Sequence, residues 1–507
     1  MKRKGLLFIL LIACIIFSVS SVAAGDTNDT ALAIDEADSI EASDINDLEI
    51  SLSNENQPVE ESNNQLSQKD DGTFTSLQSK IDLSDDGATL NLYNDYKYDA
   101  KFNATSGINI DKSITINGNG HTIDGLGKAR IFNINYGSLL KHSKVILKNI
   151  KFKNGYADIY GGAILNFADL TVDKCTFTGN YANTAGGAIN SLGALNLKNS
   201  VFEKNSAGGD AGAVFSLTIK KSFDFYRAYF KGKKASADTN LLLAILQAGL
   251  EPGQDTISNC VFKNNVAKGR GGGAVYGYSH LEINSCKFTG NKAGEDGGAV
   301  FGNKNLYIKN SKFSYNSVKK FGGAVYFKCH ELTGHYENGK WVSDVKFYDN
   351  LIQSSTFKKN SAKKGGAIYG FKYSAKDKKH GAKAVKCTFD ENKAKQGRDM
   401  FGGTTSKCKF LYYKLTLKKT AIKKSAEKLV LKATLKKAKK AVKGKKVTFK
   451  FKGKYYKAKT NKKGVAKVTI KKSVLEKLKV GKKVTYKATY KATYGKVIAK
   501  KTVKVKE

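Results

Sequence analysis

A short motif recurs through the middle of the chain at intervals of about 25 residues. It places Asn three residues after Phe and then, after a spacer, Gly-Gly-Ala followed by Ile or Val, as between Phe177 and Ile189. A unit of this size cannot bury its own apolar face, so successive units must stack on one another. The other copies begin at Phe202, Phe262, Phe288, Phe313 and Phe357. The motif therefore predicts a solenoid.

Three short runs in each unit alternate apolar and polar residues, as in Leu195–Leu197, Ser200–Phe202 and Gly212–Phe215. Alternation with period two predicts strands, and three strands with tight bends in 25 residues make one coil of a parallel β-helix. Asn tolerates the left-handed backbone of such bends and can bond the Asn of the next coil. It recurs before the Cys or Ser position (Asn149, Asn199, Asn259, Asn310) and after the Phe (Asn180, Asn205, Asn265, Asn291, Asn316, Asn360, Asn392). We expect both series to form structural ladders in a right-handed helix.

The N-terminus has the three parts of a signal peptide. Basic residues precede an apolar run from Leu6 to Phe17, and small residues end at Ala24. This pattern predicts export, with cleavage after residue 24. Lipidation of Cys14 is the alternative, but the apolar run continues past that residue. No later stretch is apolar and long enough to span a bilayer.

Composition divides the remaining chain into three parts. Residues 25–75 contain 14 acidic residues and one Lys without periodicity, which predicts a disordered acidic linker. Residues 76–410 carry the repeats, with insertions near 216–255 and 328–351 that we expect to hold a short helix (239–249) and a hairpin. Residues 411–507 alternate strands and turns and are predicted to form an immunoglobulin-like sandwich.

Lysine is concentrated in this last part of the chain. Residues 411–507 contain 35 Lys against three Glu, so they supply most of the net charge of +43. Such a surface serves solubility alone or binds an anionic wall polymer or an acidic glycan. Predicted export argues against genomic nucleic acid as a partner.

Cysteine recurs at one position of the repeat, two residues before the Phe, as Cys175, Cys260, Cys286 and Cys387. Ser fills the same position in other copies. This exchange favours stacked free thiols inside the solenoid. A disulfide between Cys260 and Cys286, one coil apart, is the alternative in an oxidising compartment.

The repeat motif resembles the repeats of chlamydial polymorphic outer-membrane proteins and related β-helical adhesins. The whole layout is similar to adhesin-like surface proteins of methanogenic archaea, which share the signal peptide, the entry segment from Ile114 to Gly125, the repeats and a Lys-rich module like Leu415–Lys506. The resemblance covers residues 76–507. It implies a cell-surface, adhesion-type role, with glycans or proteins of host or neighbouring cells as partners.

Catalysis has less support in the sequence. A β-helical polysaccharide lyase or hydrolase needs clustered carboxylates. The acidic residues that we compared do not recur at one coil position: Asp158, Asp169, Asp173, Glu203 and Asp210. The group Cys329, His330 and His335 lacks the spacing of a zinc motif and is interpreted as a loop. We therefore expect no enzyme activity, metal or cofactor.

Aromatic residues follow the Gly-Gly-Ala positions and are the candidates for ligand binding. If the preceding Ile or Val points inward, strand alternation places them on the outer face, where a ladder of rings could stack on sugars. The alternative is that they fill the core. These residues are Phe215, Tyr276, Phe301, Tyr326 and Tyr369. Tyr336 and Trp341, on the predicted hairpin with Asn338-Gly339 at its turn, are the next candidates.

Overall fold

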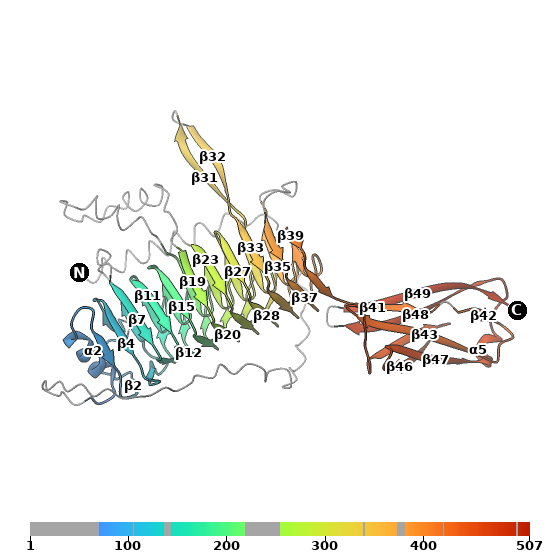
Figure 1. Cartoon of the computed structure of the whole chain (residues 1–507), viewed down its shortest axis with the longest axis horizontal. Coiled ribbons are helices and arrows are strands. Elements are labelled where there is room, and N and C mark those ends of the chain that lie inside the picture. The colour runs from blue at the N-terminus through green and yellow to red at the C-terminus, as the bar shows by residue number, and fades with distance from the viewer. Residues whose placement is uncertain are drawn as a thin grey trace. The chain divides into compact units, whose positions relative to one another are not determined.

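The computed structural model describes residues 70–104, 106–135, 143–218, 254–337, 340–372, 381–418, 420–492 and 495–507, without the side chains of 332–341 and 495. The predicted signal peptide, most of the acidic linker and the helix expected at 239–249 lie outside these residues. Two bodies of β-structure are described, a stack of parallel coils and an antiparallel sandwich (Figure 1).

The coils belong to a right-handed parallel β-helix, as predicted. In the coils from β7 to β30 the chain passes through a first sheet, a second sheet, a short fourth sheet and a third sheet before it starts the next coil, and the other coils have no strand in the fourth sheet. Every pair of neighbouring strands in these sheets is parallel and in register, so equivalent repeat positions lie above one another.

The strands have the following bounds. The first sheet contains β1 (Thr89–Asn91), β4 (Ile114–Asn117), β7 (Lys144–Lys148), β11 (Asp169–Asp173), β15 (Leu195–Lys198), β19 (Gln254–Ser258), β23 (His280–Asn284), β27 (Leu306–Lys309), β33 (Asn350–Gln353), β36 (Ala382–Val385) and β39 (Gly403–Ser406). The second contains β2 (Tyr96–Lys97), β5 (Thr122–Asp124), β8 (Lys151–Lys153), β12 (Thr176–Thr178), β16 (Val201–Glu203), β20 (Val261–Lys263), β24 (Lys287–Thr289), β28 (Lys312–Ser314), β34 (Thr356–Lys358), β37 (Thr388–Asp390) and β40 (Lys409–Leu411). The third contains β3 (Ile108–Ile110), β6 (Phe132–Ile134), β10 (Ile164–Asn166), β14 (Ile189–Ser191), β18 (Val214–Ser216), β22 (Val275–Gly277), β26 (Val300–Gly302), β30 (Val325–Lys328), β35 (Ile368–Phe371) and β38 (Met400–Phe401). The fourth contains β9 (Tyr156–Ala157), β13 (Tyr181–Ala182), β17 (Ser206–Ala207), β21 (Val266–Ala267), β25 (Lys292–Ala293) and β29 (Ser317–Val318).

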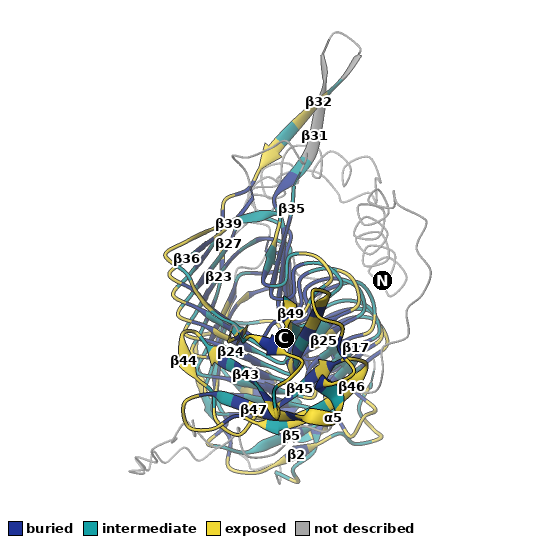
Figure 2. Cartoon of the chain, turned by 90° about the vertical axis from the view of Figure 1, so that its right-hand side faces the viewer, coloured by how far each residue is buried: buried dark blue, intermediate teal, exposed yellow. Residues whose placement is uncertain are grey.

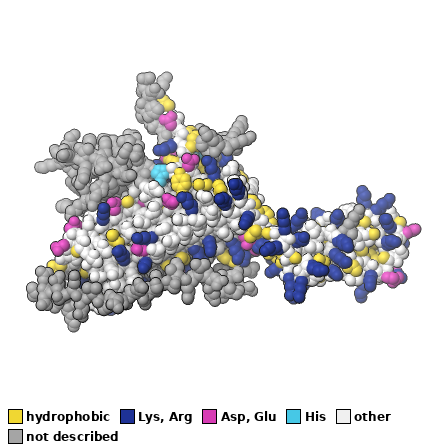
Figure 3. All heavy atoms as spheres, viewed as in Figure 1, with side chains coloured by type: hydrophobic (Ala, Val, Ile, Leu, Met, Phe, Trp, Pro, Cys, Tyr) yellow, Lys and Arg dark blue, Asp and Glu magenta, His cyan; other side chains and the backbone are white. Residues whose placement is uncertain are grey.

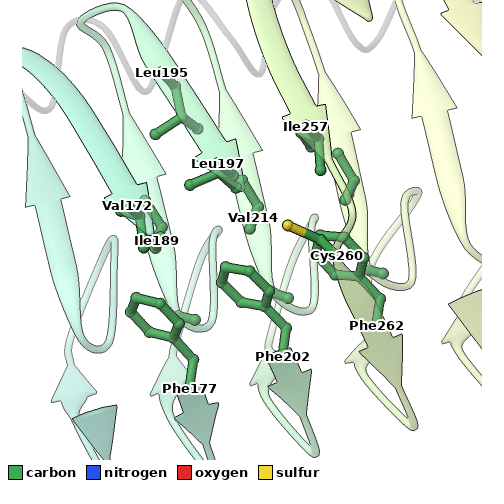
Figure 4. Packing of buried hydrophobic residues seen from close by; sticks show 14 of the residues in the cluster. Val172, Phe177, Ile189, Leu195, Leu197, Phe202, Val214, Ile257, Cys260 and Phe262 are labelled. Carbon is green, nitrogen blue, oxygen red and sulfur yellow. The ribbon is translucent and has the colours of Figure 1, made fainter. Parts of the chain in front are cut away.

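The Phe of the motif forms a continuous stack inside the helix. Successive rings lie 4.6–5.3 Å apart between centroids and within 15° of parallel, which matches the spacing of neighbouring strands. Figure 4 shows three of these rings beneath a layer of Leu, Val and Ile. The stack comprises Phe152, Phe177, Phe202, Phe262, Phe288, Phe313, Phe357 and Phe389, all fully or almost fully buried.

The Asn that follows the Phe forms the second ladder, which confirms the prediction. Each side-chain Nδ2 donates to the Oδ1 of the equivalent Asn in the next coil at 2.9–3.0 Å, from Asn180 through to Asn392. All seven amides are fully buried and point the same way. The ladder ends where Asn392 donates to the carboxylate of Asp399 at 3.0 Å.

The bends follow the predicted backbone chemistry. Asn149, Asn199, Asn259 and Asn310 all have φ between 50° and 52°. Their side chains form a mixed ladder, since Asn259 bonds Asn199 whereas Asn199 bonds Asp173. At the Gly pair, Gly186 has a φ of +66°, and a Cβ on Gly187 would lie 2.2 Å from the carbonyl oxygen of Gly212 in the next coil. Only Gly fits there.

A hairpin leaves the coils between β30 and β33. Its strands β31 (His330–Glu337) and β32 (Lys340–Phe347) are antiparallel with Glu337 opposite Lys340, so the predicted hairpin is confirmed. It is longer than expected. The interpretation of 330–335 as a loop is therefore wrong, because these residues pair with β32.

After each of the two insertions, the first strand of the next coil has a buried polar residue. The equivalent position in other coils holds an apolar residue. Asp255 accepts a hydrogen bond from the backbone N–H of Leu195, and Asn350 accepts one from that of Leu306, both at 3.0 Å. The two side chains are almost fully buried. Each side chain thus satisfies a backbone donor of the coil on which it stacks.

Helix α2 (Phe74–Leu83) covers the first coils with Phe74, Leu77 and Ile81. Thr73 and Ser76 form a reciprocal cap at its start. The predicted start of the repeat domain, residue 76, falls inside this helix.

The sandwich has two sheets around one core, an architecture compatible with the predicted immunoglobulin-like domain. The four-stranded sheet contains β41 (Tyr413–Leu417), β43 (Lys428–Lys437), β44 (Lys440–Ala441) and β47 (Val465–Lys471), and the short helix α5 (Lys472–Leu475) follows β47. The five-stranded sheet contains β42 (Ile422–Lys423), β49 (Gly495–Lys506), β48 (Lys483–Ala492), β45 (Lys446–Phe451) and β46 (Lys454–Lys459). Along β45 and β48 buried residues alternate with exposed or half-buried ones, in the colours of Figure 2.

Replacement of one ladder amide is expected to destabilise the β-helix. Asn265→Ala removes the acceptor of two Asn205 donors and the donor to the Phe202 carbonyl, which leaves buried groups unsatisfied. We expect a loss of about 2–4 kcal/mol in the free energy of unfolding, measured by denaturant titration. The control Asn196→Ala, at an exposed position of β15, should cost less than about 0.5 kcal/mol. Equal effects of the two substitutions would contradict a structural role for the ladder.

Candidate functional site

The five aromatic residues after Gly-Gly-Ala form the predicted ladder. Consecutive rings are stacked with centroids 4.4–5.5 Å apart, and the stack continues from Tyr369 to Phe401. The residue before each ring belongs to the solenoid core, so the rings lie on the outer side of the third sheet. Of the two orientations that the sequence left open, the structure shows the outer one.

The rings are nevertheless buried, so the expected exposed binding face is wrong. Phe215, Tyr276, Phe301, Tyr326 and Tyr369 are only 1–9% exposed. Segments before two of the Gly pairs fold over rings of the next coil, which sequence alternation alone could not reveal.

Specific contacts define this cover. The guanidinium carbon of Arg270 lies 5.7 Å from the ring centroid of Phe301, and a Cβ on Gly271 would lie 2.6 Å from the same ring. Phe321 stacks on Tyr369 at 4.6 Å. The aromatic ladder is thus a second packed layer, and its ring faces are closed to a sugar in this conformation.

Two carboxylates lie in the covering layer around Arg270. The Arg270 Nε and Asp296 Oδ2 atoms are 3.6 Å apart, and Asp210 accepts the backbone N–H of Gly271 at 2.8 Å. Burial raises the pKa of Asp210, and it raises that of Asp296 to about 7. Asp296 Oδ1 is buried without a hydrogen-bond partner. These groups form a polar cluster on the outer side of the ladder.

Our sequence comparison missed this pair because it did not include Asp296. Asp210 and Asp296 each stand four residues before the first residue of a third-sheet strand, two coils apart, with Gly271 between them. The sequence pattern that could have revealed the pair is an Asp at the same repeat position, shortly before the Gly-Ala segment, in two repeats. The other compared carboxylates, Asp158, Asp169, Asp173 and Glu203, occupy different positions, as stated.

A third buried carboxylate is Asp255. Thr218 Oγ1 donates to it at 2.6 Å and Ser216 Oγ also donates to it. Burial raises the pKa of Asp255 to about 6. Its hydrogen bonds all come from the adjacent coil, so its role is to close the coil break after the first insertion.

The root of the hairpin is fixed to the preceding coil. Glu331 lies 3.5 Å from the Lys304 ammonium and accepts a hydrogen bond from the Tyr348 hydroxyl. Burial by itself raises the pKa of Glu331, but the Lys304 ammonium and the hydrogen bond from Tyr348 outweigh it, so the pKa of Glu331 is lowered. Tyr336 and Trp341 are directly opposite each other in the strand register, and their side chains lie outside the description. Their role in binding stays a prediction.

The described cysteines are free thiols, as favoured from the sequence. Cys175, Cys260, Cys286 and Cys387 are buried, and the backbone N–H of Cys260 donates to the sulfur of Cys286 at 3.4 Å. Burial raises the pKa of Cys175 to about 12, far from thiolate chemistry at neutral pH. Across the described ranges no three His, Cys, Asp or Glu residues converge in a way that could hold a metal ion.

Lysine side chains are spread over the visible face of the sandwich (Figure 3). In both sheets exposed lysines alternate with buried apolar residues, as along β45 and β47. In the five-stranded sheet, Lys450, Lys487 and Lys500 lie directly opposite one another on three adjacent strands. We call them the lysine row. The strands β45, β46, β48 and β49 contain no acidic residue. Like charges in direct register repel one another. The row therefore produces a positive electrostatic potential at the surface, which favours the binding of an anion.

Comparison with known proteins agrees with this architecture. Residues 248–410 match the family model described as right handed beta helix region, and residues 174–192 match that of the Chlamydia polymorphic membrane protein repeat. The chain thus contains a right-handed β-helix with repeats of the polymorphic-membrane-protein type. Neither the curated proteins nor the solved structures gave a match.

Within the part of the chain that is described, no helix has the length and apolar character needed to cross a membrane.

Protonation of the buried carboxylates is expected to stabilise the β-helix. The pKa of Asp296 is about 7 and that of Asp255 about 6 in the folded chain, against about 4 unfolded. Between about pH 8 and pH 5 the folded state therefore takes up protons that the unfolded state does not, and the free energy of unfolding should rise as pH falls, by about 1–3 kcal/mol. Thermal and denaturant unfolding at a series of pH values measures this.

The double variant Asp255→Asn/Asp296→Asn should flatten that pH dependence. The control Asp169→Asn, at an exposed position of β11, should leave it intact. Stability that falls between pH 8 and pH 5 in the unmodified chain would contradict the burial of these carboxylates.

Proposed function

We propose that this is an exported, non-enzymatic, adhesin-like protein of the cell surface. In this proposal the β-helix displays a surface that binds glycans or proteins of host or neighbouring cells, and the basic sandwich attaches the chain to an anionic cell-wall or surface polymer. The observation that carries the proposal is the combination of a densely packed repeat scaffold with a separate module that has 35 Lys against three Glu.

Two features support a place outside the cell. The first is the signal-peptide pattern of residues 1–24. The second is the matched repeat, whose name refers to a polymorphic membrane protein of Chlamydia. Repeats that build only a packed scaffold are suited to display, because insertions can leave the coils without disturbing the stack.

The interruptions of the repeat are the best candidates for recognition. With the aromatic ladder closed, the hairpin β31–β32 offers aromatic residues away from the solenoid core, with Tyr336 opposite Trp341. Its root is held by Glu331, Lys304 and Tyr348. A fixed root lowers the entropy that is lost when a projecting element binds.

A β-helical polysaccharide lyase or hydrolase acting on acidic glycans is the second candidate. Asp210 and Asp296 favour it, since they stand in one column and burial raises the pKa of Asp296 to about 7, as a general acid requires. The pKa of Asp210 is also raised by burial, whereas the second carboxylate of such a pair must stay ionised. Against it, the Asp296 side chain is almost fully buried and its carboxylate faces Arg270. A substrate could not reach this carboxylate without displacement of the cover, so we prefer the adhesin.

Substitution of the hairpin aromatics should weaken recognition. On a glycan array and on whole cells, Tyr336→Ala/Trp341→Ala should bind at least tenfold less than the unmodified chain, because stacking surface is lost. The control Tyr93→Ala removes an aromatic ring that is 70% exposed elsewhere and should change nothing. Release of unsaturated or reducing-end products, abolished by Asp296→Asn, would instead establish the enzyme.

Attachment should depend steeply on salt. Binding of the mature chain to polyanionic wall material should fall at least tenfold between about 50 and 200 mM salt, because bound counterions compete with the lysines. A sedimentation assay with an uncharged wall polysaccharide as the control measures this. Binding that does not respond to salt would refute electrostatic attachment.

A further inference from the structure

One pair of stacked aromatic rings in the β-helix is open to solvent. Tyr156 in β9 and Tyr181 in β13 lie directly opposite each other in the fourth sheet, with ring centroids 5.9 Å apart and planes 23° from parallel. Both side chains are half-buried and point away from the coil interior, since Ala157 and Ala182, which follow them, are buried. In every other stacked pair of rings within the described residues, at least one ring is buried.

The side chains of this column become small one coil beyond the two rings. Ser206 follows Tyr181 in the register of the fourth sheet, and Val266 follows Ser206. Neighbouring strands are about 4.8 Å apart, so Tyr181 and Val266 are separated by roughly 10 Å with only the short Ser206 side chain between them in the column. Gly208, two residues after Ser206, adds no side chain. The face of the Tyr181 ring that is turned away from Tyr156 therefore has no ring stacked on it from the next coil.

Lys268 reaches over this ring from two coils away. Its ammonium nitrogen lies 5.6 Å from the centroid of the Tyr181 ring. The Lys268 side chain is exposed and makes no ion pair or hydrogen bond with the rest of the described chain. An exposed cation–π contact is weak. A ligand that packs on the Tyr181 ring can therefore displace the ammonium at little cost and then accept a hydrogen bond from it.

Polar groups with unused hydrogen-bonding capacity lie beside the ring pair. Tyr156 donates its hydroxyl to Asp158 Oδ1 at 2.9 Å, and Asn183 Nδ2 donates to the same hydroxyl oxygen at 3.4 Å. Among the described residues no group donates to the other oxygens of these two side chains, Asp158 Oδ2 and Asn183 Oδ1. Both side chains are exposed. The Tyr156 ring is thus held in a fixed orientation, and two acceptors remain for a ligand.

This combination of groups is suited to a sugar ring. A pyranose has a face of C–H groups that packs on an aromatic ring, and it has hydroxyl groups at its rim that need donors and acceptors. A purely apolar ligand would remove water from Asp158 and Asn183 without bonding them. A proline ring could also pack on Tyr181, but it has no N–H or O–H group to donate to the two acceptors.

We propose that Tyr181 and Ser206 form a sugar-binding subsite, in which one pyranose ring of a glycan stacks on Tyr181 in the place where a third Tyr of the column would stand. Asn183 and Lys268 then bond hydroxyl groups at the rim of the sugar. This inference rests on the glycan recognition proposed above and adds a site on the coils to the one on the hairpin.

The sharpest test fills the place of the sugar with a side chain. In the full mature chain, Ser206→Tyr continues the Tyr column. We expect a melting temperature no lower than that of the unmodified chain, because one more ring stacks, and an affinity for the sugar reduced by about tenfold or more. The control Ser317→Tyr places the same residue three coils further along the same column and should stay within about twofold. Calorimetry measures binding, with tetrasaccharides of glucose, N-acetylglucosamine and galacturonate as probes.

Removal of the ring gives a second readout. Tyr181→Ala should lose about tenfold or more in affinity for the tetrasaccharide that binds, whereas Tyr181→Phe keeps the ring and should stay within about threefold. The control Tyr307→Ala removes a half-buried ring from the outer side of the first sheet and should stay within about twofold.

Each other result has a defined meaning. Unchanged binding by Ser206→Tyr overturns the subsite, and glycan recognition then stands if Tyr336→Ala/Trp341→Ala still removes it. Equal loss in Ser206→Tyr and Ser317→Tyr overturns the assignment to this coil. Tighter binding of a polyproline peptide than of the sugars, abolished by Tyr181→Ala, would make a protein the ligand and overturn the sugar. Failure of the unmodified chain to bind the tetrasaccharides and every glycan of the array refutes glycan recognition together with the subsite.

Discussion

The β-helix depends on the stacking of identical side chains in strict register. One strand spacing of about 4.8 Å suits both a hydrogen bond between side-chain amides and the stacking of aromatic rings. The Asn ladder and the Phe ladder both have this spacing, and they lie on opposite sides of one bend, since Asn180 follows Phe177 by three residues. The aligned amides polarise one another along the ladder, and the Asp399 carboxylate accepts the last donor.

This constraint also decides where the chain can vary. An insertion must leave at a bend and return without shifting the next coil, because a slip of one residue would turn every side chain to the wrong face. Asp255 and Asn350 mark the two returns, where a side chain supplies the acceptor for a backbone donor. The same need for close stacking explains the Gly pairs. The outer aromatic layer is closed in the same way, since segments before two of the Gly pairs pack on rings of the next coil.

Sequence reasoning recovered the features that depend on local chemistry. The parallel β-helix, the left-handed Asn bends, the Asn ladder, the free thiols and the hairpin all follow from residue type and spacing. It failed where contacts come from segments that are not adjacent in sequence. Alternation left open whether Tyr276 and Tyr326 lie outside the third sheet or in the core, and it could not show that Arg270 and Phe321 lie over rings of this ladder. The lysine row was equally hidden, since it depends on which strands are neighbours in the sandwich.

Hydrogen exchange measured by mass spectrometry tests the closed scaffold most directly. Peptides that cover the third-sheet strands β22, β26 and β30 should be as strongly protected as those that cover β20, β24 and β28 of the Phe ladder, because both layers open only with the whole coil. The hairpin should exchange faster than either. Exchange in β22, β26 and β30 that is faster by orders of magnitude would show that the cover opens by itself. The aromatic ladder would then be accessible, and the division between scaffold and recognition surface would be wrong.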